Sequence, residues 1–395
     1  MSLNETASGE RLHIGFFGMR NAGKSSLVNR VTGQELSVVS DVLGTTTDPV
    51  AKPIELPEIG ATMIIDTPGF DDTSVLGQQR ISQTLKTIDR TDIAVVLFNT
   101  DTDFSTEQEI IGILSDRKTP FIGVLTKSDI DQPSQSVIEQ IALMTGAQPI
   151  VISAATGIGI SQLLAQLKIF AHPQQHLITE GMCKSGDTVL LVMPQDGQAP
   201  QGRIIKPQVE TLRELLDRRC IAICCTPEDM PSALANLATP PQLIITDSQV
   251  FPQVYAAKPE QSALTSFSVL FARQKGDITT FVNGAQAMLT LQPTAHILIA
   301  EACSHIPQHE DIGRVKLPRL LRQKLGQEIN IDIVGGNDFP ADLTHYDLVI
   351  HCGACMFNRA HVMSRVNRAR QQQVPVTNYG IAIAALTGIL DKVSY

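Results

Sequence analysis

Residues 18–25 read Gly-Met-Arg-Asn-Ala-Gly-Lys-Ser, which is a glycine, four residues and then Gly-Lys-Ser. An apolar, strand-like run precedes this P-loop pattern at 12–17, and a run with helical spacing follows it at 26–31. Backbone N–H groups and the helix dipole favour phosphate binding at such a turn. Lys24 is expected to reach the β- and γ-phosphates, and the Ser25 hydroxyl to bind magnesium. Further nucleotide contacts are expected from Gly18, Asn21, Ala22, Gly23 and Ser26.

A polar, turn-rich stretch, Gly-Thr-Thr-Thr-Asp-Pro, begins at residue 44. One of its threonines is expected to close over the γ-phosphate; spacing favours Thr46 or Thr47 without choosing, and Thr47 is our expected magnesium ligand. A buried-strand run then ends in Asp-Thr-Pro-Gly at 66–69. Asp66 is expected to hold magnesium through water, and the Gly69 N–H to meet the γ-phosphate. Lys24, the switch threonine, Asp66 and Gly69 thus form the predicted catalytic set.

Base selection is predicted at Thr126-Lys127-Ser128-Asp129, which follows another strand run. The Asp129 carboxylate can accept two hydrogen bonds from the amino and imino groups of guanine, whereas adenine offers an acceptor where the carboxylate needs a donor. The backbone of Ser153 and Ala154, at the end of the last strand run, is expected to meet the guanine carbonyl. The sequence therefore predicts a GTP site.

These motifs, in this order and each at a predicted strand end, resemble those of translation-factor-type small GTPases over about residues 10–172. More narrowly, they resemble the ribosome-assembly and tRNA-modification branch. That resemblance implies that Asn21 helps to bind potassium, and that GTP hydrolysis is slow and potassium-stimulated. Two residues depart from the usual patterns. Thr126 replaces the commoner Asn, and Phe70 stands where Ras-like enzymes carry the glutamine that positions water.

Length and composition limit the number of domains, the kinds of partner and the cellular setting of the protein. A chain of 395 residues is expected to form two or three domains. Its net charge of −9 and lack of a basic stretch argue against nucleic acid as a partner. No apolar run is long enough to span a membrane, and the first ten residues lack a secretory pattern. Seven cysteines then indicate a reducing, cytoplasmic setting.

We expect three α/β domains, namely a P-loop small-GTPase fold and two smaller domains with parallel sheets. Their predicted bounds are 1–172, 177–257 and 258–395. The middle domain alternates strand runs with an amphipathic helix at 207–219 and carries no evident chemistry, which favours a connector or subunit contact. Three cysteines of its strand-like run, Cys220, Cys224 and Cys225, are predicted to be buried free thiols.

Possible metal ligands collect in the last third, as Cys303-Ser304-His305 and His351-Cys352-Gly353-Ala354-Cys355. Both runs follow predicted parallel strands, so we expect them at the same sheet edge. Two metal centres fit: tetrahedral zinc with Cys₃His, or a 4Fe-4S cluster with three cysteines and one weakly ligated iron. Spacing does not choose the ligand of that iron, for which the candidates are Glu301, His305, Glu310 and His351.

The combination of GTPase domain, α/β middle domain and Cys-x-His…His-Cys-x-x-Cys resembles the FeFe-hydrogenase maturation GTPases over nearly the whole chain. This resemblance implies that Cys303, Cys352 and Cys355 bind a 4Fe-4S cluster, with His305 or His351 as possible fourth ligand. It also implies a homodimer formed through the middle domain. Such proteins are scaffolds that receive a transient di-iron precursor from two radical-SAM maturases and deliver it to apo FeFe-hydrogenase.

Two alternatives belong to other classes. One is a ribosome- or RNA-associated regulatory GTPase with a zinc-stabilised C-terminal domain. The net negative charge of the chain counts against this alternative. The other is a C-terminal metalloenzyme regulated by GTP, for which the sequence offers no base or nucleophile beyond the metal ligands.

Overall fold

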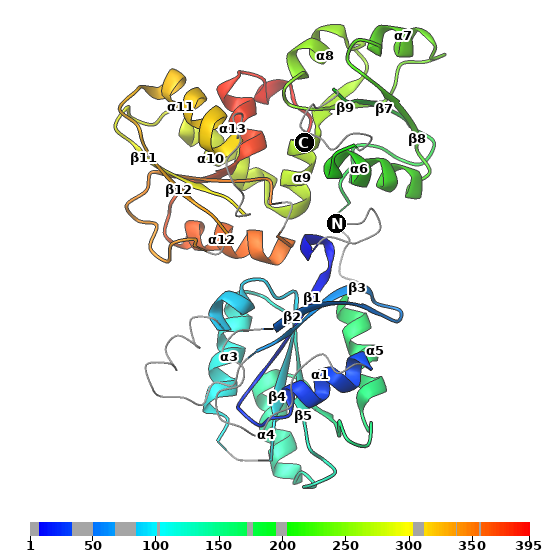
Figure 1. Ribbon diagram of the computed structural model, residues 1–395, viewed down its shortest axis with the longest axis vertical. Helices are drawn as coiled ribbons and strands as arrows, with labels where there is room; N and C mark the ends of the chain where they lie inside the picture. Colours follow the sequence, from blue (N-terminus) through cyan, green and yellow to red (C-terminus); the bar gives the residue numbers. More distant parts are fainter. Residues whose placement is uncertain are drawn as a thin grey trace. The chain divides into compact units, whose positions relative to one another are not determined.

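The computed structural model describes residues 8–33, 50–67, 84–100, 103–171, 177–194, 204–302, 312–336, 338–354 and 357–395 (Figure 1). The chain divides into two compact units. The first comprises residues 1–175 and 356–364, and the second comprises residues 176–355 and 365–395. Within the described residues, no helix combines the length and apolar character needed to cross a bilayer.

The first unit contains a six-stranded sheet of order β2-β3-β1-β4-β5-β6. Strand β2 runs antiparallel to β3, and the other pairings are parallel. The strands are β1 (Leu12–Gly18), β2 (Val50–Leu56), β3 (Gly60–Asp66), β4 (Ile93–Phe98), β5 (Phe121–Leu125) and β6 (Ile150–Val151). The helices are α1 (Lys24–Thr32), α3 (Ser105–Asp116), α4 (Gln135–Thr145) and α5 (Ile160–Ala171).

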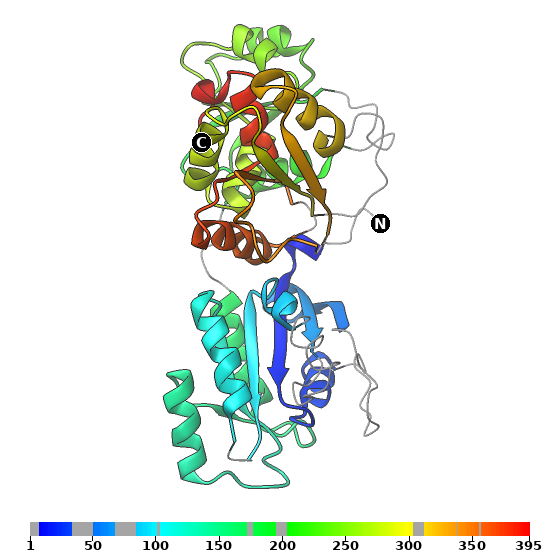
Figure 2. The ribbon, with the colours of Figure 1, turned by 90° about the vertical axis from the view of Figure 1, so that its left-hand side faces the viewer.

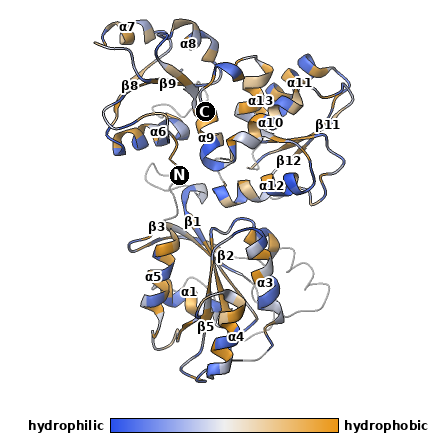
Figure 3. Ribbon diagram, turned by 180° about the vertical axis from the view of Figure 1, so that it is seen from behind, coloured by the Kyte–Doolittle hydropathy of each residue, from blue (hydrophilic) through white to orange (hydrophobic). Residues whose placement is uncertain are grey.

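Helices cover both faces of this sheet, which explains why its parallel strands are continuously apolar rather than alternating. Every residue of β4 is buried. One core cluster joins strand residues such as Val95 to Leu27 of α1 and Leu163 of α5, whereas another joins Val96 to α3 and α4. Helices α1 and α3 lie on opposite sides of the sheet in Figure 2, and Figure 3 shows its central strands as mainly hydrophobic. The predicted P-loop GTPase architecture is confirmed.

The second unit begins with a four-stranded parallel sheet of order β10-β9-β7-β8. Its strands are β7 (Thr188–Val192), β8 (Ile221–Cys225), β9 (Leu243–Thr246) and β10 (Ala263–Ser266). Its helices are α6 (Lys206–Asp217), α7 (Met230–Ala235) and α8 (Phe251–Ala257). Because β10 lies beyond residue 257 and pairs with β9, this sheet extends past the domain boundary expected from the sequence.

The cysteines of this sheet differ in exposure. Cys220, which precedes β8, is buried as predicted, but Cys224 is exposed and Cys225 is only partly covered. The prediction of three buried thiols was therefore wrong. Cys224 and Cys225 are more exposed than expected because β8 is the edge strand, so fewer neighbours cover its side chains than cover those of β7.

A second four-stranded parallel sheet has the order β12-β11-β13-β14. Its strands are β11 (His296–Ala300), β12 (Asn330–Val334), β13 (Leu348–His351) and β14 (Val376–Asn378), which confirms the strand runs expected in the last third. The associated helices are α9 (Phe267–Lys275), α10 (Ile278–Met288), α11 (Leu317–Leu325), α12 (Arg359–Gln371, of which residues from 365 belong to this unit) and α13 (Tyr379–Leu386).

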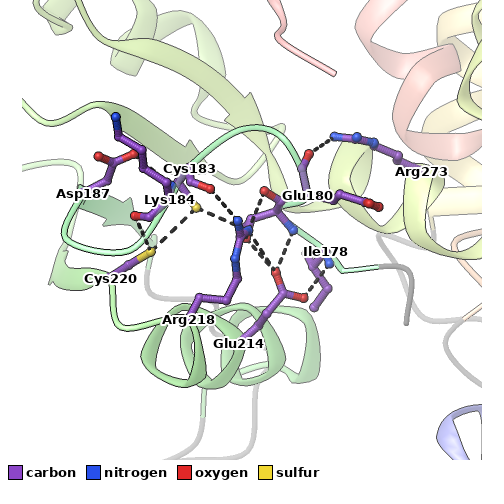
Figure 4. A network of polar contacts seen from close by, with 10 residues as sticks. Ile178, Glu180, Cys183, Lys184, Asp187, Glu214, Arg218, Cys220 and Arg273 are labelled. Atoms are coloured by element: carbon purple, nitrogen blue, oxygen red, sulfur yellow. Dashed lines mark hydrogen bonds and ion pairs between the residues drawn. The ribbon is translucent and has the colours of Figure 1, made fainter. Parts of the chain in front are cut away.

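Figure 4 shows how helix α6 holds the loop before β7. Glu214 accepts hydrogen bonds from the Ile178 and Thr179 amides and the Thr179 hydroxyl. The Arg218 guanidinium donates to the Thr179 carbonyl at 2.7 Å and to the Cys183 carbonyl. Cys183 Sγ lies 3.8 Å from Cys220 Sγ. A single helical turn, Glu214 to Arg218, thus fixes this loop through its backbone.

We predict that Arg218→Ala loosens this loop. The substitution removes the donor from the Thr179 and Cys183 carbonyls, at a cost of about 2–3 kcal/mol. Deuterium exchange of peptides covering residues 177–187 should therefore accelerate strongly. Arg213→Ala is the matched control, because the Arg213–Asp217 pair on the same helix is exposed and screened by solvent, so its loss should not change the exchange. Equal exchange in both variants would contradict this account.

Candidate nucleotide and metal sites

The P-loop connects β1 to α1 through two glycines that no other residue replaces easily. Gly18 has φ +150°, and a Cβ there would lie 2.7 Å from the Leu97 carbonyl oxygen. Gly23 caps helix α1 with φ +86°. Between them, Asn21 has φ +59° and is exposed, while Ser26 lies in the first turn of α1. The predicted turn from strand to helix N-terminus is present, and it is the geometry that binds phosphate.

Lys24 is the first residue of α1 and is only 7% exposed. Its Nζ donates to the Gly18 carbonyl at 2.9 Å and to the Met19 carbonyl at 2.8 Å. These bonds hold the ammonium across the P-loop backbone, where it can meet nucleotide phosphates.

Ser25 and Asp66 form the described part of the predicted magnesium site. Strands β1 and β3 pair so that Phe16 is in register with Asp66. The Ser25 hydroxyl donates to Asp66 Oδ2 at 2.8 Å. Asp66 Oδ1 is buried and has no hydrogen-bond partner among the described residues. A hydroxyl beside a buried, incompletely paired carboxylate fits hydrated Mg²⁺, which prefers oxygen ligands.

The base-recognition motifs lie at the carboxyl ends of β5 and β6, at the same sheet edge as the P-loop. Lys127 has φ +60°, and Asp129 lies exposed on the turn that follows. The Ser128 amide donates to the Ile152 carbonyl at 3.3 Å, so the two motifs are joined. Ser153 is buried and its hydroxyl accepts from the Thr156 amide, while Ala154 is partly exposed. The expected convergence of the two motifs is present.

Thr126, the departure from the usual asparagine, links the base motif to the P-loop. Its buried hydroxyl lies 2.8 Å from the Ala22 carbonyl and 3.0 Å from the Phe98 carbonyl, either of which can accept its proton. A threonine can therefore supply a side-chain link between these two loops.

Thr126→Val keeps the shape of the side chain and removes this donor. We expect the affinity for GDP to fall by about fivefold to tenfold, because one buried hydrogen bond of about 1 kcal/mol is lost and a carbonyl is left without its donor. Titration with a fluorescent GDP analogue measures the change. Thr126→Ser, which retains the hydroxyl, should bind almost as tightly as the natural protein. Equal affinity of the Val and Ser variants would refute the link.

Other predicted residues of the GTP site lie outside the described residues, so their roles stay predictions. They are Thr45, Thr46, Thr47, Gly69 and Phe70.

Sequence reasoning missed one residue that contacts the P-loop, Glu107 of α3. Its Oε1 accepts a hydrogen bond from the Met19 amide at 3.1 Å. The available signal was its helical spacing, because Glu107 falls on the same buried face as Ile110, Ile111 and Leu114. Glu107 thus interrupts the apolar face of α3 with an acidic side chain.

In the second unit, Cys352 immediately follows β13 and its amide donates to the Ala300 carbonyl of β11 at 2.9 Å. Its Sγ accepts from the Ala302 amide at 3.0 Å and from the Ala354 amide at 3.4 Å. Ala302 directly precedes Cys303 in the sequence, so the residue before one predicted ligand run contacts Cys352 of the other. Amide donors favour a thiolate, which is the form that binds metal.

His351 is the last residue of β13 and is 1% exposed. Burial, followed by the nearby Arg365 charge, lowers the pKa of its imidazole to about 3, so the ring is neutral. Arg365 Nη1 lies 3.2 Å from Nε2 and must donate to it, which leaves the proton on Nδ1 for the Cys352 carbonyl at 2.8 Å. Both ring nitrogens are engaged, and metal binding by His351 would require one contact to break.

Glu301 is also buried, and Arg314 donates to its Oε2 from Nε and Nη2. Cys303, His305, Glu310 and Cys355 lie outside the described residues. No group of three or more His, Cys, Asp or Glu residues suited to a metal occurs within the described part of the chain. The donor chemistry around Cys352 fits a thiolate-bound metal centre, and the full ligand set stays a prediction.

Fold and nucleotide motifs together define a P-loop GTPase. In agreement, the family model for the 50S ribosome-binding GTPase matches residues 13–127. The hydrogen maturase F dimerization domain matches residues 178–276, and the hydrogen maturase F tetramerization domain matches residues 279–394. These two models cover more than half of the chain. The chain therefore belongs to the hydrogen maturase F family.

Two of the curated relatives to which the chain is similar are GTPases. GTPase Der of Clostridium kluyveri is 28% identical over 178 residues, and GTPase Der of Kosmotoga olearia is 30% identical over 185 residues. These matches cover 42% and 44% of this chain, and 40% and 42% of the relatives. The chain thus spans about two fifths of the length of these relatives. A crystal structure of an Aquifex aeolicus Era variant bound to GDP·AlF4⁻ matches at TM-score 0.37 and 18% identity, covering 54% of this chain and 92% of that chain.

Proposed function

We propose that this protein is a GTP-hydrolysing iron–sulfur scaffold that carries a di-iron precursor to apo FeFe-hydrogenase during assembly of the hydrogenase active site. The observation that carries the proposal is the position of Cys352, whose sulfur accepts hydrogen bonds from Ala302 and Ala354 in a hydrogen maturase F domain. Two radical-SAM maturases are the proposed source of the precursor.

The proposed cluster is 4Fe-4S, bound by Cys303, Cys352 and Cys355. Three thiolates leave one iron with an exchangeable ligand, and such a position allows a carrier to bind cargo and release it. His305 and His351 are the possible ligands of this iron. The contacts of His351 with Arg365 and with the Cys352 carbonyl count against His351, because one of them would have to break for it to bind the iron.

On the nucleotide side, we propose slow, potassium-stimulated hydrolysis. Asn21 is the proposed potassium ligand, and its exposed position on the P-loop supports this role. Thr47 is the proposed magnesium ligand beside Ser25, with Thr46 and Gly69 near the γ-phosphate. Phe70 cannot orient water, since its side chain has no polar group. GTP state would act by changing contacts with the maturation partners.

We propose that the dimerization domain pairs two copies through β8. This strand is at the edge of its sheet, Ile221 on it is 56% exposed, and Val209 and Leu216 of the adjoining α6 are also exposed. An exposed apolar edge is a ready interface. Ile221→Lys is expected to shift the chain toward monomer in light scattering. Leu143→Lys, at an exposed position of α4, should leave the mass unchanged. An unchanged mass in both variants would contradict the interface.

The proposed function is tested by activating apo FeFe-hydrogenase with the full chain and both radical-SAM maturases. The natural chain should restore hydrogen production, and Cys352→Ser should fail because one cluster thiolate is lost. Cys183→Ser, which lies outside the proposed interface strand and keeps an acceptor for Arg218, is the matched control and should activate normally. Full activation by Cys352→Ser would overturn the scaffold proposal.

A further inference from the structure

Glu107 is an acidic residue in the buried face of α3. The side chain is 2% exposed and shares that face with Ile110, Ile111 and Leu114. An apolar residue would continue this face without removing a carboxyl group from water, which is costly unless the group is hydrogen-bonded. The reason for a carboxylate should therefore be found in its contacts.

Those contacts lead to the P-loop. Glu107 Oε1 accepts from the Met19 amide at 3.1 Å, and the Met19 carbonyl accepts from Lys24 Nζ at 2.8 Å. Met19 is thus held on its amide side by a carboxylate and on its carbonyl side by the ammonium that serves the nucleotide. Glu107 Oε2 is buried and has no hydrogen-bond partner among the described residues. In the described part of the chain, the backbone group outside α3 that this carboxyl contacts is the Met19 amide.

The electrostatics agree with this geometry. Burial raises the pKa of the Glu107 carboxyl, and Asp103 adds to that rise, whereas the hydrogen bond from its own amide, the Met19 hydrogen bond and the Lys24 charge oppose it. Met19 and Lys24 of the P-loop region thus add to the stabilisation of the charged form of Glu107.

We propose that Glu107 is a positioning residue of the nucleotide site, which fixes the Met19 peptide and with it the backbone of the phosphate-binding turn. Met19 precedes the residues whose amides surround the phosphates, so its orientation sets the start of the phosphate-binding turn. The contact joins α3 to the P-loop backbone and does not involve the γ-phosphate. It should therefore support GDP and GTP binding equally.

The test uses the full chain with Glu107→Leu and Glu107→Gln, and Glu109→Leu as control on the exposed side of the same helix. We expect Glu107→Leu to raise the Kd for GDP and the KM for GTP by about tenfold, the effect of one lost hydrogen bond to a charged group, with kcat within about twofold. Glu107→Gln keeps an acceptor and removes the charge, and should raise both by about threefold. Glu109→Leu should change neither.

A purely packing role predicts a different result, because Leu would fit the apolar face and leave Kd unchanged. A folded Glu107→Leu variant that binds GDP within about twofold of the natural protein would overturn the proposal. So would an equal loss of kcat and kcat/KM with unaltered KM, since that pattern marks a transition-state contact. If the Leu variant does not fold, the Gln variant decides: unchanged GDP affinity overturns the proposal, and the expected loss supports it.

Discussion

Lys24→Ala is expected to lower kcat/KM for GTP by about a thousandfold. The natural Nζ bridges the Gly18 and Met19 carbonyls, which places a positive charge at the phosphate-binding turn. Alanine removes this charge from the β- and γ-phosphates, where negative charge must be stabilised in the transition state. It also leaves both carbonyls without that donor in a largely buried site. Steady-state release of phosphate at saturating potassium and magnesium measures the loss.

Lys118→Ala is the control for this prediction, because Lys118 is exposed at the end of α3 and has no nucleotide role. It should hydrolyse GTP at the natural rate. A Lys24→Ala variant that retains more than about a tenth of the natural kcat/KM would show that the ammonium is not a principal phosphate contact.

Asp129→Asn is expected to exchange the base preference of the protein from guanine to xanthine. The Asp129 carboxylate offers two acceptors to the imino and amino protons of guanine. An asparagine amide offers one acceptor and one donor, so its donor would face the guanine amino group but would meet a carbonyl of xanthine. A site built on hydrogen bonds rejects the mismatched ligand by a large factor, and we expect a change in the GDP:XDP affinity ratio of at least about a thousandfold.

Affinities for GDP and XDP measured by calorimetry on the same preparations give this ratio. Asp131→Asn is the control, since Asp131 is an exposed carboxylate on the same turn and has no predicted role in base recognition. The assignment would be refuted by an Asp129→Asn variant that still prefers GDP to XDP.

The turn from strand to helix at the P-loop could be predicted from the sequence because its signals are local. A P-loop between a strand and a helix fixes its own backbone through Gly18 and Gly23. Thr126 was recognised only as a departure from a motif. Its hydroxyl contact to Ala22 spans 104 positions and depends on how the two loops meet in the folded sheet. Glu107 was missed for the same reason, since its partner Met19 lies on another element.

The strand ends that carry the predicted metal ligands could also be placed from the sequence. Adjacent parallel strands place the residues after β11 and β13 at one edge, which explains why Cys352 meets the Ala302 amide. The contact of His351 with Arg365 was not visible, because it requires α12 to fold back against β13. Cys224 was assigned to the core from its apolar neighbours, and the edge position of β8 that exposes it follows from strand order, which those neighbours do not encode.

The most direct test of the scaffold proposal is the metal content of the protein, purified without air and reconstituted with iron and sulfide. The account predicts about four irons and four sulfides per chain, with an EPR signal of the reduced cluster that is lost in Cys303→Ala. It would be contradicted by about one zinc per chain and no reducible cluster, because the cysteines would then form a structural site without an exchangeable position.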